Sequence, residues 1–555
     1  MEGTYILGTN SSPNWISESG LQFIQLPDSE NEQRVHDFIV DSFKDKTVDK
    51  LIVSLDDQPN IGLATALHFR LMPDQIGKNC LAHIIFVFSD DLSSYLKYGN
   101  SSQLFLSKGV SYCPGDELKY VINATDRLSP SDYINQFIRH IHITPAANIG
   151  RHSLANQWGA SVLGEMITNG VIPENAEIQN ASKTLYFKYT AVKERGKEEL
   201  FGNEKTSGAK NNCLKSSGKK ILLIDDEADR GWSYVLKSYF SNAQKFDVIN
   251  HPMADEDDMT DDEIQMIEDN DYDLILLDLR LNGFSEENNV DVKNFSGWKI
   301  LDMIKQYNEG IQVIIFTASN KAWNIKGLLD AGADGYYIKE SPEFHSNVFS
   351  KDNYRSFKDT VDKCLSRGYL RSMVNYIDSV KAKSFSIPSD DKNALIKQLE
   401  MGYSMLSLAS KADSPQSASA KKMFAYAYVS FFSCIETLTK SYIDDSQNGL
   451  KFISDNASVP EWIIEQNTIR QASSQAKRGE FSIAQKVVAI YKKKNLSLAN
   501  NQAKELANIT RLRNNFIHDV SKQIVFSTIA TEPIDTDKGC LQIFEKVKTV
   551  IRDLG

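Results

Sequence analysis

Residues 273–281, DLILLDLRL, decide the fold of the central part of this chain. The apolar run 274–277 is typical of a strand that is buried on both faces of a parallel sheet. Asp278 follows this run, so we expect its carboxylate at the carboxyl end of the strand, where open α/β sheets bind their ligands. A carboxylate in that position predicts a chemical role for this edge of the sheet.

Three further strand-like segments also end in polar side chains. KKILLIDDE places Asp225 and Asp226 after an apolar run, QVIIFTAS ends near Thr317, and DGYYIKES ends near Lys339. Because the carboxyl ends of parallel strands share one edge, we expect these side chains to converge on Asp278. Close carboxylates repel one another unless a cation lies among them, and oxygen ligands suit Mg²⁺. The pattern therefore predicts phosphoryl transfer to Asp278, with Lys339 paired to the phosphate oxygens.

These motifs resemble the receiver domain of two-component response regulators over about 219–345. The resemblance implies a flavodoxin-like (βα)5 fold, Mg²⁺ as cofactor and a sensor histidine kinase as phosphoryl donor. It also implies a set of functional residues, namely the phosphoacceptor Asp278, the metal ligands Asp225, Asp226 and Asp278, and the phosphate-binding or switch residues Thr317, Tyr336 and Lys339. Two departures from the family pattern are Glu340, where a proline commonly follows the lysine, and the long polar segment 282–295. The alternative is a doubly wound domain with incidental acids, but it does not explain matching residue types on successive strand ends.

The bulk composition limits the class of protein. A chain of 555 residues suggests about three or four domains, and its six cysteines show no CxxC pair, which favours a reducing cytoplasm without disulfides or zinc. The N-terminus has no basic region followed by an apolar core, and no apolar run approaches the ~20 residues of a membrane span. The net charge of −11 argues against a protein that coats duplex DNA. We expect a multidomain cytoplasmic protein.

Residues 1–192 are interpreted as a second α/β module. Its expected elements are strands at 4–7, 51–55, 84–88 and 104–106 and a helix over 62–71. The order suggests a degenerate receiver copy, in which Asp56, Ser89 and Cys113 stand at the acceptor, threonine and lysine positions. Without an acidic pair or the lysine, Asp56 is not expected to take phosphate efficiently. Parallel strands look alike in any α/β domain, so an unrelated α/β module remains the alternative.

Two segments separate this module from the receiver-like domain, which we place at 219–366. Residues 148–170 predict one amphipathic helix, in which His152 and Asn156 share a face. Their HxxxN spacing resembles the phosphoacceptor box of sensor kinases, and the alternative is a packing or interface helix. Residues 193–218 are polar, aperiodic and rich in Gly, Ser and Lys, which is typical of a flexible linker.

Residues 367–555 change to a helical pattern and predict an all-helical bundle. The expected helices are 369–383, 392–410, 421–443, 461–478, 483–491, 502–520 and 541–552. Within 451–526, twelve Lys and Arg stand against six Asp and Glu, a net charge of +6 that suits a polyanion. A solvated helix face explains the same count.

The helix expected at 502–520 contains an R-N-x-x-x-H pattern, formed by Arg513, Asn514 and His518. A histidine with a near-neutral pKa can move the proton of a ribose 2′-hydroxyl, and a guanidinium can stabilise charge on the attacked phosphate. The pattern resembles the HEPN superfamily of helical nucleotide-binding domains, whose ribonuclease members carry it. That resemblance implies RNA cleavage without metal in a site formed between two copies of the chain, with Glu436 as a polar partner. The alternative keeps Arg513 as a surface charge and His518 as a packed histidine.

The leading hypothesis from the sequence is a phosphorylation-controlled effector. A kinase phosphorylates Asp278, and the added charge rearranges the receiver and controls a homodimeric HEPN-like ribonuclease with a role in stress or anti-phage defence. The alternative is a non-enzymatic phosphorelay adaptor or phosphate sink, whose helical domain binds a protein or RNA partner.

Overall fold

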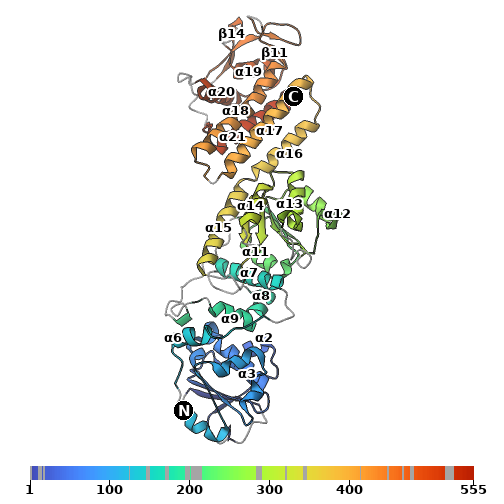
Figure 1. Cartoon of the computed structure of the whole chain (residues 1–555). Helices are drawn as coiled ribbons and strands as arrows, with labels where there is room; N and C mark the ends of the chain where they lie inside the picture. Colours follow the sequence, from blue (N-terminus) through green and yellow to red (C-terminus); the bar gives the residue numbers. More distant parts are fainter. Residues whose placement is uncertain are drawn as a thin grey trace. The chain divides into compact units, whose positions relative to one another are not determined.

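Figure 1 shows the helices and strands of the whole chain in the computed structural model. The chain comprises two compact units. The first comprises residues 1–303 and 313–365, and the second comprises residues 304–312 and 366–555. The structure describes residues 3–9, 15–16, 19–123, 126–145, 151–168, 174–193, 195, 200–201, 216–282, 291–318, 322–341, 347–412, 414–446, 449–465, 468–475, 481–518 and 531–555. None of the helices in these ranges combines the length and apolarity that a membrane span needs.

The first unit begins with a parallel five-stranded sheet in the order β2-β1-β3-β4-β5. Its strands are β1 (Thr4–Gly8), β2 (Gln22–Gln25), β3 (Lys50–Ser54), β4 (His83–Val87) and β5 (Val110–Cys113). Alternate strand residues enter different cores, since Leu7 packs in one hydrophobic cluster and Ile6 in another. Helices therefore cover both faces of the sheet, as expected for an α/β module.

The helices of this module include α2 (Glu32–Phe43), α3 (Pro59–Arg70), α4 (Pro73–Ile76), α5 (Leu118–Asn123) and α6 (Pro130–Asp132). The strand expected at 104–106 is wrong, because these residues lie in the 3₁₀ helix Gly99–Leu106. Leu104 and Phe105 are buried while Leu106 is exposed, so the short apolar run follows helical rather than strand burial.

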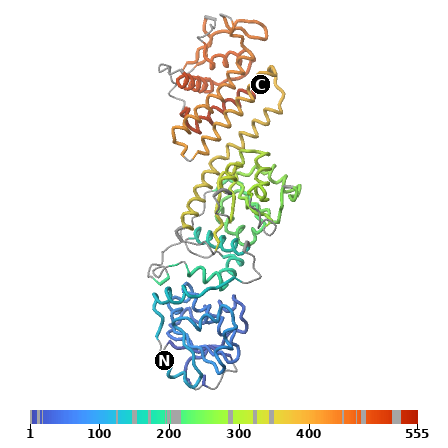
Figure 2. Tube along the Cα trace, viewed as in Figure 1, coloured from blue at the N-terminus to red at the C-terminus, as the bar shows by residue number. Residues whose placement is uncertain are grey.

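A second parallel sheet, in the order β10-β9-β8-β6-β7, forms the receiver-like part of the first unit. Its strands are β6 (Lys220–Ile224), β7 (Lys245–Ile249), β8 (Leu274–Asp278), β9 (Val313–Thr317) and β10 (Gly335–Ile338). The associated helices are α11 (Trp232–Tyr239), α12 (Asp261–Asp269), α13 (Ser296–Tyr307), α14 (Ala322–Asp330) and α15 (Asn347–Ser366). Each sheet is built from one continuous range of the chain, blue for the first and green to yellow for the second (Figure 2). Every residue of β8 is buried, in agreement with the buried strand predicted from the apolar run 274–277.

After α6 the chain continues with α7 (Arg151–Thr168), α8 (Ala176–Ser182) and α9 (Leu185–Lys193), which precede the second sheet in the sequence. Helix α7 corresponds to the amphipathic helix expected at 148–170. Its residues Ala160, Leu163 and Ile167 join the core that contains Trp232 and Val235 of α11. Helix α7 is therefore packed on the receiver-like sheet and its first helix. The predicted linker falls mostly outside the described residues.

The second unit contains a helical core whose members are α16 (Tyr369–Ala382), α17 (Ser389–Lys411), α18 (Ala418–Lys440), α19 (Ile483–Lys493), α20 (Asn500–His518) and α21 (Asp537–Leu554). These helices match six of the seven expected there. The unit also includes the end of α13 and the turn after it, because Asn308 donates to the Arg371 carbonyl and the Asn375 side chain.

The expectation of an all-helical C-terminal domain is wrong at residues 461–478. This segment forms the antiparallel strands β13 (Pro460–Ile464) and β14 (Ile469–Gln475), and β11 (Ile443–Asp444) pairs with β12 (Lys451–Phe452). The tryptophan and β-branched residues of 462–464 favour strand over helix, and the polar residues 465–468 that follow are typical of a short connection. The weak helical periodicity of 461–478 therefore did not predict the observed hairpin.

Candidate phosphoacceptor site

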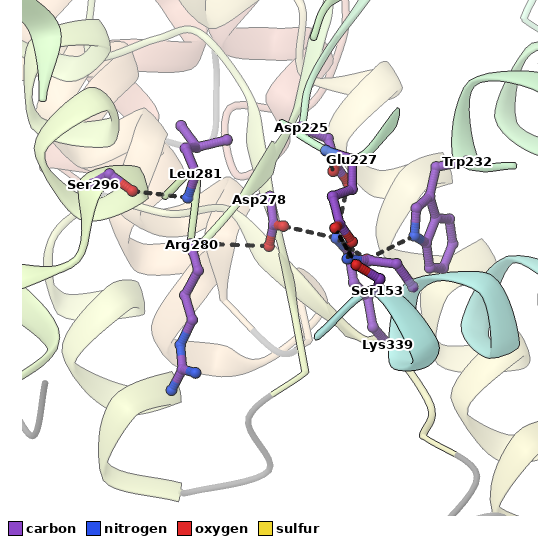
Figure 3. A network of polar contacts seen from close by, with 10 residues as sticks. Ser153, Asp225, Glu227, Trp232, Asp278, Arg280, Leu281, Ser296 and Lys339 are labelled. Carbon is purple, nitrogen blue, oxygen red and sulfur yellow. Dashed lines mark hydrogen bonds and ion pairs between the residues drawn. The ribbon is translucent and has the colours of Figure 1, made fainter. Parts of the chain in front are cut away.

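The carboxyl ends of the second sheet bring together the residues that the sequence placed at strand ends. Asp278 is the last residue of β8, Asp225 follows β6, and Lys339 follows β10. The Lys339 Nζ atom lies 2.8 Å from Asp278 Oδ2 and 2.8 Å from Asp225 Oδ2 (Figure 3). All three side chains are buried, at 2% exposure or less. The ammonium group is therefore shared between two carboxylates inside the protein.

Asp225, Asp226 and Asp278 also form a cluster of potential metal ligands. One carboxylate oxygen from each lies within 4.8 Å of the others, a spacing that suits a single divalent cation. Burial raises the pKa of Asp226 to about 8, and repulsion from Asp278 and Asp225 adds to the rise. Burial also raises the pKa of Asp225, although Lys339 opposes this effect. The raised pKa values mean that the charged forms of Asp225 and Asp226 are unfavourable in this site, so a bound cation would stabilise them. Carboxylate oxygens of this kind suit Mg²⁺.

The charge state of Lys339 follows from its partners. Burial alone would lower the pKa of its ammonium group, but the carboxylates of Asp225 and Asp278 outweigh burial and raise it above its usual value. The Nζ atom also lies 5.4 Å from the centre of the Trp232 ring. Lys339 is therefore held as a cation at the place where a phosphoryl oxygen on Asp278 would need one.

Helix α7 contributes a residue to this site that the sequence did not assign there. The Asn156 Oδ1 atom accepts hydrogen bonds from Lys339 Nζ at 2.8 Å and from Trp232 Nε1 at 3.0 Å. Asn156 Nδ2 donates to Glu227 Oε2 at 2.7 Å, and Ser153 Oγ donates to Glu227 Oε1 at 2.5 Å (Figure 3 shows Ser153 on its helix beside Glu227). These contacts fit the packing alternative for the HxxxN helix. The His152 side chain lies outside the described residues.

One signal in the sequence could have pointed to Asn156. It lies on the same helix face as Ala160, Leu163 and Ile167, so a single polar residue heads an otherwise apolar stripe. A buried polar side chain needs a hydrogen-bonding partner. The stripe alone could not identify Lys339, which is far away in the sequence.

The two predicted switch residues, Thr317 and Tyr336, occupy different environments. Thr317 ends β9 and is buried, and its carbonyl accepts a hydrogen bond from the Lys339 backbone N–H. Tyr336 lies on β10 with 37% of its surface exposed, while the next residue, Tyr337, is buried. The predicted switch aromatic is therefore available for rearrangement, and its neighbour belongs to the core.

Glu340 stands where receiver domains commonly have a proline, and its side chain is buried. Its buried carboxylate accepts hydrogen bonds from Ser350 Oγ and from Asn353 Nδ2 of α15. These bonds tie the segment after Lys339 to α15. Residues 283–290 of the polar segment and Pro342 lie outside the described residues.

In the first sheet, the residues at the positions corresponding to Asp278, Thr317 and Lys339 are Asp56, Ser89 and Cys113, which offer different chemical groups. Asp56 Oδ1 accepts a hydrogen bond from the Ser89 backbone N–H at 2.9 Å, and Cys113 is buried at the end of β5. Among the described residues of this module, no three carboxylate, histidine or cysteine side chains form a metal-ligand cluster.

Some of the site residues predicted in the second unit lie in contact with one another. Arg513 of α20 forms an ion pair with Glu436 of α18 at 2.7 Å, and its guanidinium lies 5.3 Å from the centre of the Phe432 ring. Arg513 Nη1 also donates to Asn514 Oδ1 at 3.1 Å. His518 is the last residue of α20, and its side chain is outside the described residues. The structure thus brings Arg513, Asn514 and Glu436 together.

Comparison with known proteins supports the receiver interpretation. A protein-family model described as an inactive receiver domain matches residues 9–113, in agreement with the degenerate receiver expected in the N-terminal module. The nitrate/nitrite response regulator protein NarP of Escherichia coli (strain K12) is 28% identical over 143 residues, which cover 25% of this chain and 58% of that relative.

Solved structures similar to this chain include a CheY-like response regulator receiver domain protein from Methanospirillum hungatei JF-1, at 21% identity and a TM-score of 0.17, covering 26% of this chain and 99% of that chain. They also include a two-component response regulator from Clostridium difficile, at 23% identity and a TM-score of 0.18, covering 26% of this chain and 96% of that chain. Together, the family model and the NarP match lead to one conclusion: the N-terminal part of the chain contains a receiver-type domain, of the kind found in two-component signalling proteins.

Proposed function

We propose that this protein is a response regulator that accepts a phosphoryl group on Asp278 from a partner histidine kinase. The observation that carries the proposal is the buried Lys339 ammonium, 2.8 Å from Asp278 and beside the acidic cluster. We place the receiver domain at 219–366 and the effector domain at 367–555.

In the proposed step, a carboxylate oxygen of Asp278 attacks the phosphorus atom of a phosphohistidine. The new O–P bond forms as the N–P bond breaks, and the electron pair of that bond stays on the imidazole of the donor. Lys339 then pairs with a phosphoryl oxygen, and Thr317 and Tyr336 are the residues that respond to the new charge. Asp225, Asp226 and Asp278 would hold Mg²⁺, which neutralises negative charge on the incoming phosphoryl group.

Intact-mass measurement with acetyl phosphate and MgCl₂ tests the acceptor. We expect one phosphoryl adduct on the wild-type chain and none on Asp278→Asn. Asp56→Asn is the matched control, because it alters the counterpart aspartate of the first sheet and should leave the adduct in place. An adduct that survives Asp278→Asn would contradict the proposal.

We also propose that phosphorylation controls RNA cleavage by a HEPN-like effector that acts as a homodimer, with Arg513, Asn514 and His518 at the site. The ion pair between Arg513 and Glu436 supports this, because it fixes the guanidinium beside Asn514 on the helix that ends at His518. Arg513 would stabilise charge on the attacked phosphate, and His518 would move the proton of the ribose hydroxyl.

A non-enzymatic adaptor is the second candidate, and one observation favours it. The Arg513 guanidinium is already engaged by Glu436 and packed over Phe432, as it would be in a purely structural role. Incubation of a mixed tRNA pool with phosphorylated and unphosphorylated protein separates the two functions. Cleavage that depends on Asp278 and is lost in His518→Ala supports the ribonuclease, whereas intact RNA in every reaction supports the adaptor.

A further inference from the structure

Where α7 meets the acceptor site, every N–H donor of the Lys339 ammonium group is engaged. An ammonium group has three N–H donors, and Lys339 directs them to Asp225, Asp278 and Asn156, each at 2.8 Å. Its side chain is 1% exposed. A phosphoryl group on Asp278 therefore has to take a donor that is already in use.

The three present acceptors are not equally strong. Asp225 and Asp278 are carboxylates, whereas the Asn156 Oδ1 atom belongs to a neutral carboxamide. Phosphorylation converts Asp278 into an acyl phosphate, so the Lys339 donor that it held passes to a phosphoryl oxygen, while Asp225 keeps its charge. The phosphoryl group carries a charge of about −1.5 to −2 and three acceptor oxygens, so it also competes for the donor on the carboxamide, which is the weakest acceptor that remains.

We propose that Asn156 is a positioning residue of the acceptor site and that phosphorylation of Asp278 loosens α7 from the receiver-like sheet. This inference rests on the proposed function of Asp278. In the unphosphorylated protein, Asn156 holds the Lys339 ammonium from one side and Glu227 from the other. When the phosphoryl oxygens draw Lys339 toward themselves, its charge-assisted hydrogen bond to the uncharged Asn156 side chain is lost.

The packing around α7 connects the hydrogen bond between Asn156 and Lys339 to other parts of the first unit. The face of α7 opposite Asn156 carries Trp158, whose ring lies 5.0 Å from the ring of Phe187 on α9. Helix α9 also enters the core of the first sheet through Tyr189 and Val192. A loosened α7 therefore alters the support of a helix that packs in the core of the first sheet.

Hydrogen exchange of the full-length chain, followed by mass spectrometry over residues 153–168, tests the inference. We expect exchange in α7 to become roughly tenfold faster when acetyl phosphate and MgCl₂ phosphorylate the wild-type protein, the size expected from one charge-assisted hydrogen bond. Asp278→Asn should show no change. Asn156→Ala should exchange fast without phosphorylation, and phosphorylation should add little.

Ser153→Ala is the matched control, because it removes a bond from α7 to Glu227 without touching Lys339. It should keep the phosphorylation-dependent change. Coupling is reciprocal, so Asn156→Ala should also bind beryllium fluoride, a phosphoryl mimic, roughly tenfold more tightly. A merely structural role for Asn156 would give weaker binding.

The outcomes distinguish this inference from the function on which it rests. A phosphoryl adduct on Asp278 without faster exchange in α7 overturns the inference and leaves the acceptor role intact. The absence of any adduct overturns both.

Discussion

Lys339 places one positive charge between two buried carboxylates and so offsets part of the negative charge at the acidic edge of the sheet. The ion pairs to Asp225 and Asp278 have almost no access to solvent. Removing one partner of a buried ion pair leaves a charge without compensation, which costs far more than breaking an exposed pair. The lysine is therefore both a structural counter-ion and the group that a phosphoryl oxygen would meet.

Lys339→Met should lower the free energy of unfolding of the metal-free protein by about 3 kcal/mol. Urea unfolding without Mg²⁺ measures this loss. Addition of MgCl₂ should stabilise the variant more than the wild type, because the carboxylates no longer have the lysine as a competing cation. Lys219→Met, which breaks the more exposed pair with Asp273, should cost less than about 1 kcal/mol. Equal losses in the two variants would count against the counter-ion role.

Much of the acceptor site could be predicted from the sequence, because strand ends converge by a general rule. Apolar runs followed by Asp225, Asp278 and Lys339 were sufficient to place all three at one sheet edge. Asn156 could not be assigned in this way. Its partner Lys339 is 183 positions away, and only the packing of α7 on the sheet brings the two side chains into contact.

At the scale of the elements, helix α7 depends on a close approach at Gly159. A Cβ atom there would lie 2.9 Å from Trp232 Cζ2 and 3.3 Å from the Glu340 carbonyl oxygen. Trp232 is fully buried and cannot move aside easily. The glycine therefore allows α7 to reach the receiver-like sheet, although glycine is unfavourable within a helix.

Gly159→Ala should weaken the docking of α7 by about 1–3 kcal/mol, because overpacking outweighs the gain of up to about 1 kcal/mol in helix propensity. Hydrogen exchange in residues 153–168 measures the effect and should be faster in the variant. Slower exchange would mean that propensity dominates and that the contact with Trp232 is loose.

Helix α9 carries a buried lysine that makes the first module sensitive to pH. The Lys188 Nζ atom lies 2.7 Å from His68 Nδ1, and burial lowers the pKa of Lys188 to about 7. Glu32 and Asp37 oppose that shift, whereas Lys183 adds to it. Burial and the Lys188 charge also lower the pKa of His68 well below its usual value. The pair is therefore poorly suited to carrying positive charge.

The sign of the Lys188 effect follows from proton linkage. Its folded pKa of about 7 lies below the unfolded value near 10.5, so the unfolded chain binds more protons between these pH values. The destabilisation is full below pH 7 and is relieved as the pH rises. Lys188→Met should therefore gain thermal stability relative to the wild type at pH 7, and this gain should shrink by pH 9.5. Lys193→Met, an exposed change on the same helix, should show a constant difference.

The β13–β14 hairpin shows where element prediction fails for a physical reason. Residues 461–478 contain apolar and polar positions that can be aligned with either a helical or a strand period. Pairing between the two strands provides hydrogen bonds that the local sequence does not reveal. Long helices such as α17 and α18 were predicted well because their periodicity extends over many turns.

At the scale of the whole molecule, the division into two units does not follow chain order. Residues 304–312 are the end of α13 and the turn that leads to β9, yet they belong to the second unit. Asn308 is buried and bonds Arg371 and Asn375, and a Cβ on Gly310 would lie 2.5 Å from the Leu370 carbonyl carbon. The sequence predicted a domain boundary near 366. It did not predict that residues 304–312, the returning segment, belong to the second unit, because the composition of this segment does not differ from that of the residues around it.

Asn308→Ala should lower the stability of the second unit by about 2 kcal/mol, because it removes buried hydrogen bonds to Arg371 and Asn375. Urea unfolding of the full chain, with the adduct on Asp278 measured in parallel, checks this. Phosphorylation should be unaffected. Glu309→Ala changes the exposed neighbour and should stay within about 0.5 kcal/mol of the wild type. A loss of the adduct in Asn308→Ala would contradict the assignment of this residue to the second unit.

The returning segment also bears on how such a protein can be re-engineered. A chimera that joins a foreign receiver to residues 367–555 at the chain boundary would discard Asn308 and Gly310 along with the native receiver. The transplanted second unit would then lack part of its own interior. A working graft must carry residues 304–312 across into the new host, which makes the two halves less interchangeable than their order in the gene suggests.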